Sequence, residues 1–176
     1  MKNQFIIILE GPMGAGKSTL SALLIPKLPR TGLLGIDKIK WFLSDFERTD
    51  ADNAIIGKVM LAMAKAFLEQ DCNVLIDQAF WKIEYVQPFI DLANERGAKL
   101  HFYQLEAPVE VLRERIKNRP IKPGRPPYPE GRVENNLKLW GGNRYELGQT
   151  FDTSKVSLES IADIILQDVS GAVQPE

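Results

Sequence analysis

The chain has 176 residues, of which 44% are hydrophobic and 26% charged, with a formal net charge of −1. This length suits one domain, and the charge balance is unlike that of dedicated nucleic-acid binders, which are usually basic overall. The single cysteine, Cys72, excludes an internal disulfide and fits a reducing compartment. No apolar run is long enough for a signal peptide or a membrane span. We therefore expect one cytoplasmic domain over residues 1–176, with no membrane contact.

Strand-like and helix-like segments alternate along the chain. Short apolar runs predict strands over residues 5–9, 31–36, 73–77, 100–105 and 149–152. Helical spacing and capping residues predict helices from about Lys17, over 50–70 and 83–95, from Pro108 to about Asn118, over 135–140 and after Ser157, with a short irregular or helical piece at 37–42. Either Asp50 or Asp52 is expected to cap the second of these helices, and Gly97 to end the third. Such alternation is typical of a parallel sheet with helices on both faces.

The stretch from residue 113 to residue 144 differs in charge from the rest of the chain. It contains nine basic and three acidic residues in a protein that is otherwise acidic. Residues 119–131 within it hold five prolines and two glycines, a composition that excludes regular structure. We predict a local anion site here, with a lid over about residues 113–135 that closes over a bound triphosphate.

The segment after the first strand, Gly11-Pro-Met-Gly-Ala-Gly-Lys17-Ser18, matches the Walker A pattern at every fixed position. It follows a predicted strand and opens a predicted helix, which is the context that this motif requires. Its backbone amides and the helix N-terminus would surround phosphate oxygens. Lys17 would reach the β- and γ-phosphates, and the Ser18 hydroxyl would bind Mg²⁺. The predicted ATP-binding residues of this loop are Gly11, Met13, Gly14, Ala15, Gly16, Lys17, Ser18 and Thr19.

Other sequence features narrow the class of nucleotide-binding protein. A GTPase should carry a base-specifying Asn-Lys-x-Asp, which this chain lacks, and its one Asp-x-x-Gly, at residues 168–171, lies beyond the last predicted helix. An oligomeric ATPase would normally need additional domains, for which the chain has no length. A small phosphotransferase remains.

The chain resembles the small P-loop kinases of the nucleoside monophosphate and shikimate kinase superfamily. It is most similar to the branch of zeta toxin-like, chloramphenicol phosphotransferase-like and polynucleotide 5′-kinase-like proteins. The resemblance rests on five segments in order: GPMGAGKST, LLGIDKIK, VLIDQAFW, LEAPVEVLRERIKNRP and FDTSKVSLESIADII. It implies a three-layer P-loop fold with a five-stranded parallel sheet in the order 2-3-1-4-5, and transfer of phosphate that depends on ATP and Mg²⁺.

Two carboxylates at predicted strand ends are candidates for the acceptor side. Asp37 follows the second strand, where it could orient or deprotonate an acceptor hydroxyl, or merely cap the next helix. The resembling branch often has Asp-x-x-Arg here, whereas this chain has Lys40 in the last position, so a bidentate guanidinium contact is not expected from it. Asp77 ends the third strand and could hold Mg²⁺, face the acceptor together with Gln78, or cap a turn. Trp41 could line an acceptor pocket or pack in the core.

Basic residues of the stretch 113–144 are candidates for phosphate contacts. The resemblance matches Arg115 and Arg119 to an Arg-x-x-x-Arg that leads into a lid, where an arginine can neutralise charge during transfer. Among these arginines, Arg119 is the preferred catalytic residue, so the predicted catalytic residues are Lys17, Asp37 and Arg119. Arg125, Arg132 and Arg144 are candidates for acceptor binding, and the turn Asp152-Thr153-Ser154 is expected to lie against the adenine.

The predicted function is ATP- and Mg²⁺-dependent transfer of the γ-phosphate to a hydroxyl group of a small molecule. One alternative is a polynucleotide 5′-hydroxyl kinase, which the net charge disfavours. Another is a nucleotide-binding regulator that hydrolyses ATP slowly and has no acceptor. The sequence leaves the acceptor and the oligomeric state open.

Overall fold

Five parallel strands form a single sheet in the order β2-β3-β1-β4-β5. The computed structural model describes residues 4–119, 131–142 and 146–171. The strands are β1 (Phe5–Glu10), β2 (Thr31–Leu34), β3 (Asn73–Asp77), β4 (Lys99–Glu106) and β5 (Gln149–Asp152). This topology confirms the predicted sheet order. β2 ends two residues earlier than its apolar run predicts, because Ile36 already begins the next helix.

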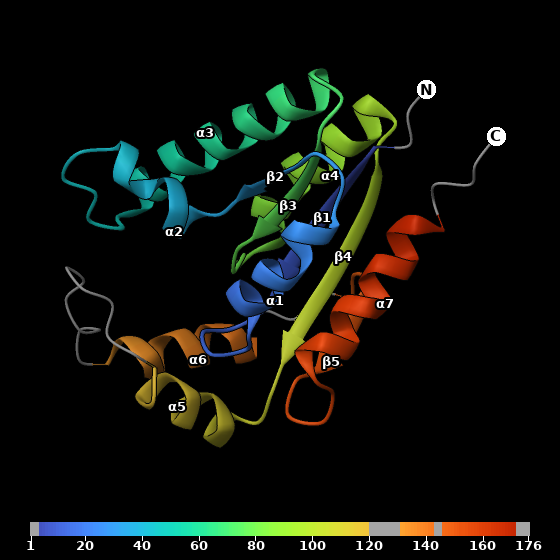
Figure 1. The fold of residues 1–176 in the computed structure, drawn as a ribbon. Helices are drawn as coiled ribbons and strands as arrows, with labels where there is room; N and C mark the ends of the chain where they lie inside the picture. Colours follow the sequence, from blue (N-terminus) through green and yellow to red (C-terminus); the bar gives the residue numbers. More distant parts are fainter. Residues whose placement is uncertain (1–3, 120–130, 143–145, 172–176) are drawn as a thin grey trace.

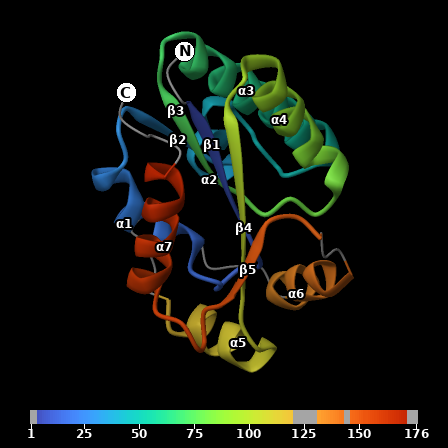
Figure 2. The ribbon, with the colours of Figure 1, turned by 90° about the vertical axis from the view of Figure 1, so that its right-hand side faces the viewer.

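Helices cover both faces of the sheet and its carboxyl edge (Figures 1 and 2). They are α1 (Lys17–Leu24), α2 (Ile36–Ile39), α3 (Asp50–Glu69), α4 (Ile83–Arg96), α5 (Val109–Lys117), α6 (Arg132–Gly142) and α7 (Leu158–Ser170), with short 3-10 helices η1 (Ile25–Lys27) and η2 (Lys40–Phe42). Helices α1 and α7 pack on one face, and α3 and α4 on the other (Figure 2). Helices α5 and α6 lie beyond the ends of the strands, where the predicted site should be.

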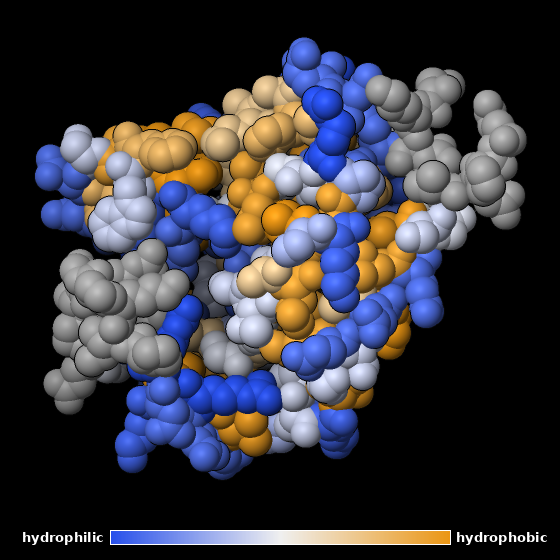
Figure 3. Space-filling view, in the orientation of Figure 1, coloured by the Kyte–Doolittle hydropathy of each residue, from blue (hydrophilic) through white to orange (hydrophobic). Residues whose placement is uncertain are grey.

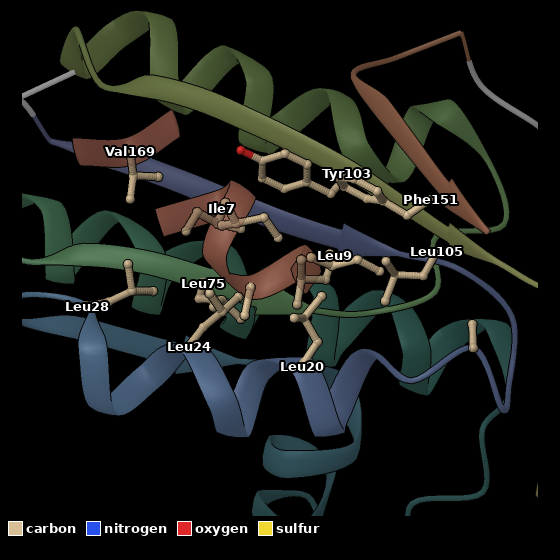
Figure 4. Packing of buried hydrophobic residues seen from close by; sticks show 14 of the residues in the cluster. Ile7, Leu9, Leu20, Leu24, Leu28, Leu75, Tyr103, Leu105, Phe151 and Val169 are labelled. Carbon is tan, nitrogen blue, oxygen red and sulfur yellow. The ribbon is translucent and has the colours of Figure 1, made fainter. Parts of the chain in front are cut away.

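The core explains why β1 reads as an unbroken apolar run. Ile7 and Leu9 point into a cluster with α1 and α7 that includes Leu20 and Leu24 (Figure 4). Alternate residues of the same strand, such as Ile8, join a second cluster with α3 and α4. A strand covered on both faces has no polar side to present to water. Burial of each large aliphatic side chain contributes roughly 1.5–3 kcal/mol, so β1 holds the phosphate-binding loop on the most firmly packed part of the sheet.

The helix caps agree with the sequence at two positions and differ at a third. Helix α4 ends at Gly97, whose φ of 64° is in the left-handed region, and the Ser157 side chain accepts the Ser160 N–H at the start of α7. At α3 the cap is Thr49, whose hydroxyl accepts the Asp52 N–H at 3.1 Å, so the assignment to Asp50 or Asp52 is wrong. Both aspartates lie inside the first turn, where acidic residues stabilise the helix dipole.

The outer surface around α5, beyond the carboxyl end of the sheet, is mostly hydrophilic. Hydrophilic side chains gather over the lower part of the face in Figure 3, around α5, whereas apolar side chains reach the surface higher up, near α3. Within the ranges that the structure describes, no helix combines the length and the apolar character needed to cross a membrane.

Candidate nucleotide and acceptor site

The phosphate-binding loop joins β1 to α1 through backbone conformations that require glycine. Gly11 has φ of 146°, and a Cβ added there would lie 2.3 Å from the Leu105 carbonyl oxygen. Gly16 has φ of 100° and precedes α1, and no described side chain caps this helix. The first amides of α1 are therefore left for an external acceptor. A cradle that a side chain would fill, at an uncapped helix N-terminus, fits the phosphates of a nucleotide.

Lys17 lies at the centre of this loop. Its ammonium donates to the carbonyl oxygens of Gly11 at 2.7 Å and Pro12 at 3.1 Å. These contacts hold the Nζ atom beside the loop amides, where the Walker A lysine is expected. Desolvation lowers the pKa of Lys17, which favours exchange of these neutral partners for the charge of a phosphate.

Charged residues from several segments surround Lys17. The charges of Asp77, Glu10 and Asp37 oppose the lowering of the Lys17 pKa, and that of Arg119 adds to it. Each of these groups therefore lies within electrostatic reach of the ammonium. The sequence assigns Asp37 to the acceptor, Asp77 to the metal or the acceptor, and Arg119 to the γ-phosphate, and the charges of all three act on the pKa of this one lysine.

Glu10 is a site residue that sequence reasoning missed. It is fully buried at the end of β1, and its Oε2 accepts the Phe80 N–H at 2.7 Å, while Oε1 has no hydrogen-bond partner among the described residues. Burial raises the pKa of Glu10 from 4.5 to about 8, although the Phe80 N–H and Lys17 oppose this rise. The available signal was a charged residue that ends an otherwise apolar strand directly before the loop.

Arg115 connects the phosphate-binding loop to the turn after β5. Its Nη1 donates to the Thr153 hydroxyl at 2.8 Å and to the Gly14 carbonyl at 3.4 Å, and its Nη2 donates to the Thr153 carbonyl at 2.8 Å. In the same turn Asp152 accepts from the Ser154 hydroxyl and N–H, which lower the Asp152 pKa to about 2. The predicted adenine-side residues are thus adjacent to the loop, with Arg115 fixing their relative position.

Helix α6 contacts the loop directly through Asn136. The Asn136 Oδ1 accepts the Met13 N–H at 3.0 Å, so an α6 side chain occupies one of the loop amides. Leu137 and Trp140 are buried in α6. An asparagine within a helix has no distinctive sequence pattern, so this contact could not be predicted.

Asp37 forms two ion pairs at the carboxyl end of β2. Its Oδ1 accepts from the Lys40 ammonium at 2.7 Å and from the Arg48 guanidinium. Partial desolvation acts to raise the Asp37 pKa, but Lys40 and Arg48 outweigh it and lower the pKa to about 2. The carboxylate is ionised at neutral pH, and its side chain is 64% exposed. A bound acceptor could therefore reach it. Arg48 lies eleven residues away in sequence and was not foreseen.

The end of β3 is tied to α2 by two neighbouring side chains. The Asp77 Oδ2 accepts from the Lys38 ammonium at 3.0 Å, and this carboxylate is almost fully buried. The Gln78 Oε1 accepts the Ile36 N–H at 2.9 Å, and its Nε2 donates to the Ala79 carbonyl. Both residues thereby hold α2 in place, which is a structural use of groups that the sequence proposed for metal and acceptor.

Ser18 and Asp77 are the predicted Mg²⁺ ligands. Ser18 is exposed in the first turn of α1, and the Asp77 carboxylate lies near Lys17. No cluster of three or more His, Cys, Asp or Glu side chains suited to a metal ion occurs in the described ranges. A hydroxyl, one carboxylate and substrate phosphates suit Mg²⁺, which binds few protein ligands and keeps several waters. Lys38 forms an ion pair with Asp77, so direct coordination of Mg²⁺ by Asp77 requires this ion pair to open.

The remaining candidates differ in how far the structure places them. Trp41 is 62% exposed, and the Lys40 ammonium lies 4.8 Å from its ring centroid, so this ring is available to an acceptor rather than part of the core. The charge of Arg132, at the start of α6, acts on Lys40. Arg125 and Arg144 lie outside the described residues, as do residues 120–130 of the predicted lid, and these assignments stay predictions.

The fold and the loop define a P-loop nucleotide-binding protein. Residues 6–138 match the model of the AAA domain family, and the chain belongs to this family. A search of curated proteins found no match to the sequence.

Solved structures that include two kinases have the same fold over nearly the whole chain. A sugar kinase from Janibacter sp. HTCC2649 is 17% identical with a TM-score of 0.68, covering 98% of this chain and 99% of the other. Kti12 from Chaetomium thermophilum, in complex with ADP-AlF3, is 16% identical with a TM-score of 0.68, covering 97% and 100%. The Mycobacterium tuberculosis APS kinase CysC, in complex with AMPPNP and APS, is 15% identical with a TM-score of 0.65, covering 96% and 98%. At these identities the likeness establishes the kinase-like fold.

Proposed function

We propose that this protein transfers the γ-phosphate of ATP to a hydroxyl group of a small molecule, with the help of Mg²⁺. One observation carries the proposal. Asp37 lies in α2, directly after the carboxyl end of β2, its side chain is 64% exposed, and its charge opposes the lowering of the Lys17 pKa. An exposed carboxylate at this edge of the sheet, on the side of the phosphate-binding lysine, is suitably placed to contact an acceptor hydroxyl beside the γ-phosphate.

The residues would divide the work between positioning and charge. The loop amides and Lys17 hold the β- and γ-phosphates, and Asp37 accepts a hydrogen bond from the acceptor hydroxyl. The acceptor oxygen then forms a bond to the γ-phosphorus as the bond to the β-phosphate oxygen breaks. Because the transition state of such transfers is loose, orientation matters more than early proton removal. A carboxylate with a pKa of about 2 is well suited to orientation and is a weak base.

Charge that develops on the transferred group needs neutralisation. Arg119 lies close enough to Lys17 to affect its pKa, which supports a role at the γ-phosphate. Ser18 and Asp77 would hold Mg²⁺, which when bound supplies positive charge between the β- and γ-phosphate oxygens. The Asn136 contact to Met13 supports a position of α6 over the same loop.

The test is acceptor-dependent release of ADP from ATP and Mg²⁺ across a panel of hydroxyl compounds: sugars, sugar acids, amino alcohols, nucleosides and 5′-hydroxyl oligonucleotides. We expect at least one small molecule to increase ADP release, and Lys17→Ala to remove the increase. Stimulation by oligonucleotides alone, weakened by salt, would support the polynucleotide kinase instead. Slow ADP release that no compound increases would contradict the proposal and support a nucleotide-binding regulator.

A further inference from the structure

Two cations share one oxygen atom at the acceptor end of the site. The Asp37 Oδ1 accepts from both Lys40 and Arg48. Among the described residues, Asp37 is the only carboxylate within salt-bridge distance of either cation. An exposed carboxylate needs no second cation to remain ionised, since water already stabilises it. The arrangement therefore has more positive charge than its carboxylate requires.

Lys40 shows where this excess charge acts. Its side chain is only 10% exposed, and its ammonium lies against the Trp41 ring. Desolvation lowers the pKa of Lys40, and the charges of Arg48 and Arg132 lower it further, against the effect of Asp37. The side chains of Lys40 and Arg48, from η2 and the α2–α3 connection, thus meet at one carboxylate oxygen. A second anion bound there would reduce the repulsion among them.

The backbone at Arg48 points to the same region. Arg48 has φ of 64°, a conformation that is uncommon for residues other than glycine, asparagine and aspartate. Its carbonyl oxygen accepts from the Asn53 side chain at 3.1 Å, which fixes the turn before the α3 cap. Strained residues of this kind gather at ligand-binding positions.

We propose that Arg48, together with Lys40, binds an anionic group of the phosphate type on the acceptor molecule. A guanidinium presents a planar fork of donors that matches two oxygens of a phosphate, which an ammonium does not. Position 40 holds a lysine, and Arg48 supplies a guanidinium to the same carboxylate from another segment. The acceptor is then a phosphorylated hydroxyl compound, with its hydroxyl at Asp37 and its phosphate between Arg48 and Lys40. This inference rests on the proposed function for the identity of the ligand, but its test does not.

The test measures binding of inorganic phosphate while the nucleotide site is full. The protein is saturated with AMPPNP and Mg²⁺, so that added phosphate cannot enter the Walker A loop, and phosphate is titrated calorimetrically. We expect one additional phosphate site. Arg48→Gln, which keeps a hydrogen-bonding side chain but removes the charge, should weaken it about tenfold or more, the usual scale for a lost charged hydrogen bond. Arg48→Lys should weaken it less.

Arg30 provides a matched control. It is also an arginine with positive φ, of 39°, but it lies at the amino end of β2, beside Cys72, whereas Asp37 follows the carboxyl end of this strand. Arg30→Gln should leave phosphate binding unchanged. If Arg48→Gln does not fold, Lys40→Gln tests the same site without altering residue 48. Absence of a phosphate site in the AMPPNP-bound protein, or equal affinities in wild type, Arg48→Gln and Lys40→Gln, would overturn the proposal.

The result is separable from that of the proposed function. If phosphate binding depends on Arg48 but the protein has no transferase activity, the proposed function is wrong and the anion site is supported. If the protein phosphorylates an uncharged hydroxyl compound but binds no phosphate at Arg48, the proposed function is supported and this inference is overturned. A second measurement compares acceptors in pairs: a phosphorylated alcohol should have a lower KM than its unphosphorylated parent, and Arg48→Gln should abolish the difference.

Discussion

The nucleotide half of the site and the proposed acceptor half differ in the kind of groups that form them. The nucleotide half consists of backbone: glycines in restricted conformations, an uncapped helix N-terminus, and Lys17 hydrogen-bonded to loop carbonyls. The proposed acceptor half consists of side-chain ion pairs, in which Asp37 binds Lys40 and Arg48, and Asp77 binds Lys38. A fixed loop can bind the phosphate chain that all ATP-using proteins share, whereas paired side chains can exchange partners when an acceptor binds.

The difference has a consequence for how each half responds to ligand. To bind phosphates, the loop needs only two changes: the Met13 N–H must leave Asn136, and Lys17 must leave the loop carbonyl oxygens. Ion pairs on the acceptor side must open or share their partners when a substrate arrives. We therefore expect substitutions in the nucleotide half to reduce binding and turnover together, and those in the acceptor half to separate the two.

The largest effect is expected at Lys17. Lys17→Ala removes the ammonium that stabilises charge on the transferring phosphate, and should reduce kcat by more than about 10³-fold. The Lys17 contacts are confined to the loop, so circular dichroism and the melting temperature should change little. Near-normal kcat in this variant would mean that the loop is not the catalytic centre.

Asp37→Asn should follow, with a loss of transfer on the order of 10²–10⁴-fold. The amide can still accept a hydrogen bond but has lost the charge that orients the hydroxyl and pairs with Lys40 and Arg48. ATP affinity, measured by calorimetry, should remain within a few-fold of wild type. An equal loss of ATP affinity would indicate that Asp37 binds the metal, and would contradict the division of the site into a nucleotide half and an acceptor half.

Arg119→Ala should give a smaller effect, about 10²-fold on kcat, with little change in nucleotide affinity. Its charge is needed most in the transition state, when negative charge spreads over the transferred group. Measuring kcat and the AMPPNP dissociation constant in the same preparation separates the two quantities. A change confined to AMPPNP affinity would assign Arg119 to ground-state binding.

The smallest effect concerns stability and the buried Glu10. Its pKa of about 8 in the folded protein lies above the ordinary value of 4.5, so the folded state retains a proton that the unfolded state has lost. Stability should then fall as pH rises from about 4.5 through about 8, and Glu10→Gln should remove this fall. Urea unfolding should show no gain for Glu10→Gln at pH 4 and a gain of roughly 2–5 kcal/mol at pH 8. Equal gains at both pH values would contradict a buried, proton-retaining carboxyl.

The sequence predicted the fold and the nucleotide half because their signals are local. The apolar run of β1 and the glycines of the Walker A motif lie within fourteen consecutive residues, and each carries its own conformational requirement. Gly97 and Ser157 likewise cap their helices through contacts with residues that are close to them in the sequence. The sequence placed the end of β2 two residues too late, because Ile36 already begins α2. It missed the Thr49 cap because Thr49, Asp50 and Asp52 are all of residue types that cap helices.

The acceptor half could not be predicted to the same degree, because its contacts join segments far apart. Arg48 reaches Asp37 through a turn that has no distinctive sequence pattern, and the Lys38–Asp77 pair joins α2 to the end of β3. Asp37 and Asp77 were found because they follow strand ends, a position that the topology makes meaningful. Their partners carry no such signal, since lysines and arginines are common on any surface.

The central claim is that the two halves act on one γ-phosphate, which passes from ATP to a hydroxyl. Its most direct test is ³¹P NMR of ATP, Mg²⁺ and the most effective acceptor of the hydroxyl panel, incubated with the protein. We predict that the γ-phosphate resonance is replaced by that of a new phosphate ester, in amounts equal to the ADP formed, and that Asp37→Asn slows its appearance. Conversion of the γ-phosphate into inorganic phosphate alone, at the same rate with and without acceptor, would contradict the claim.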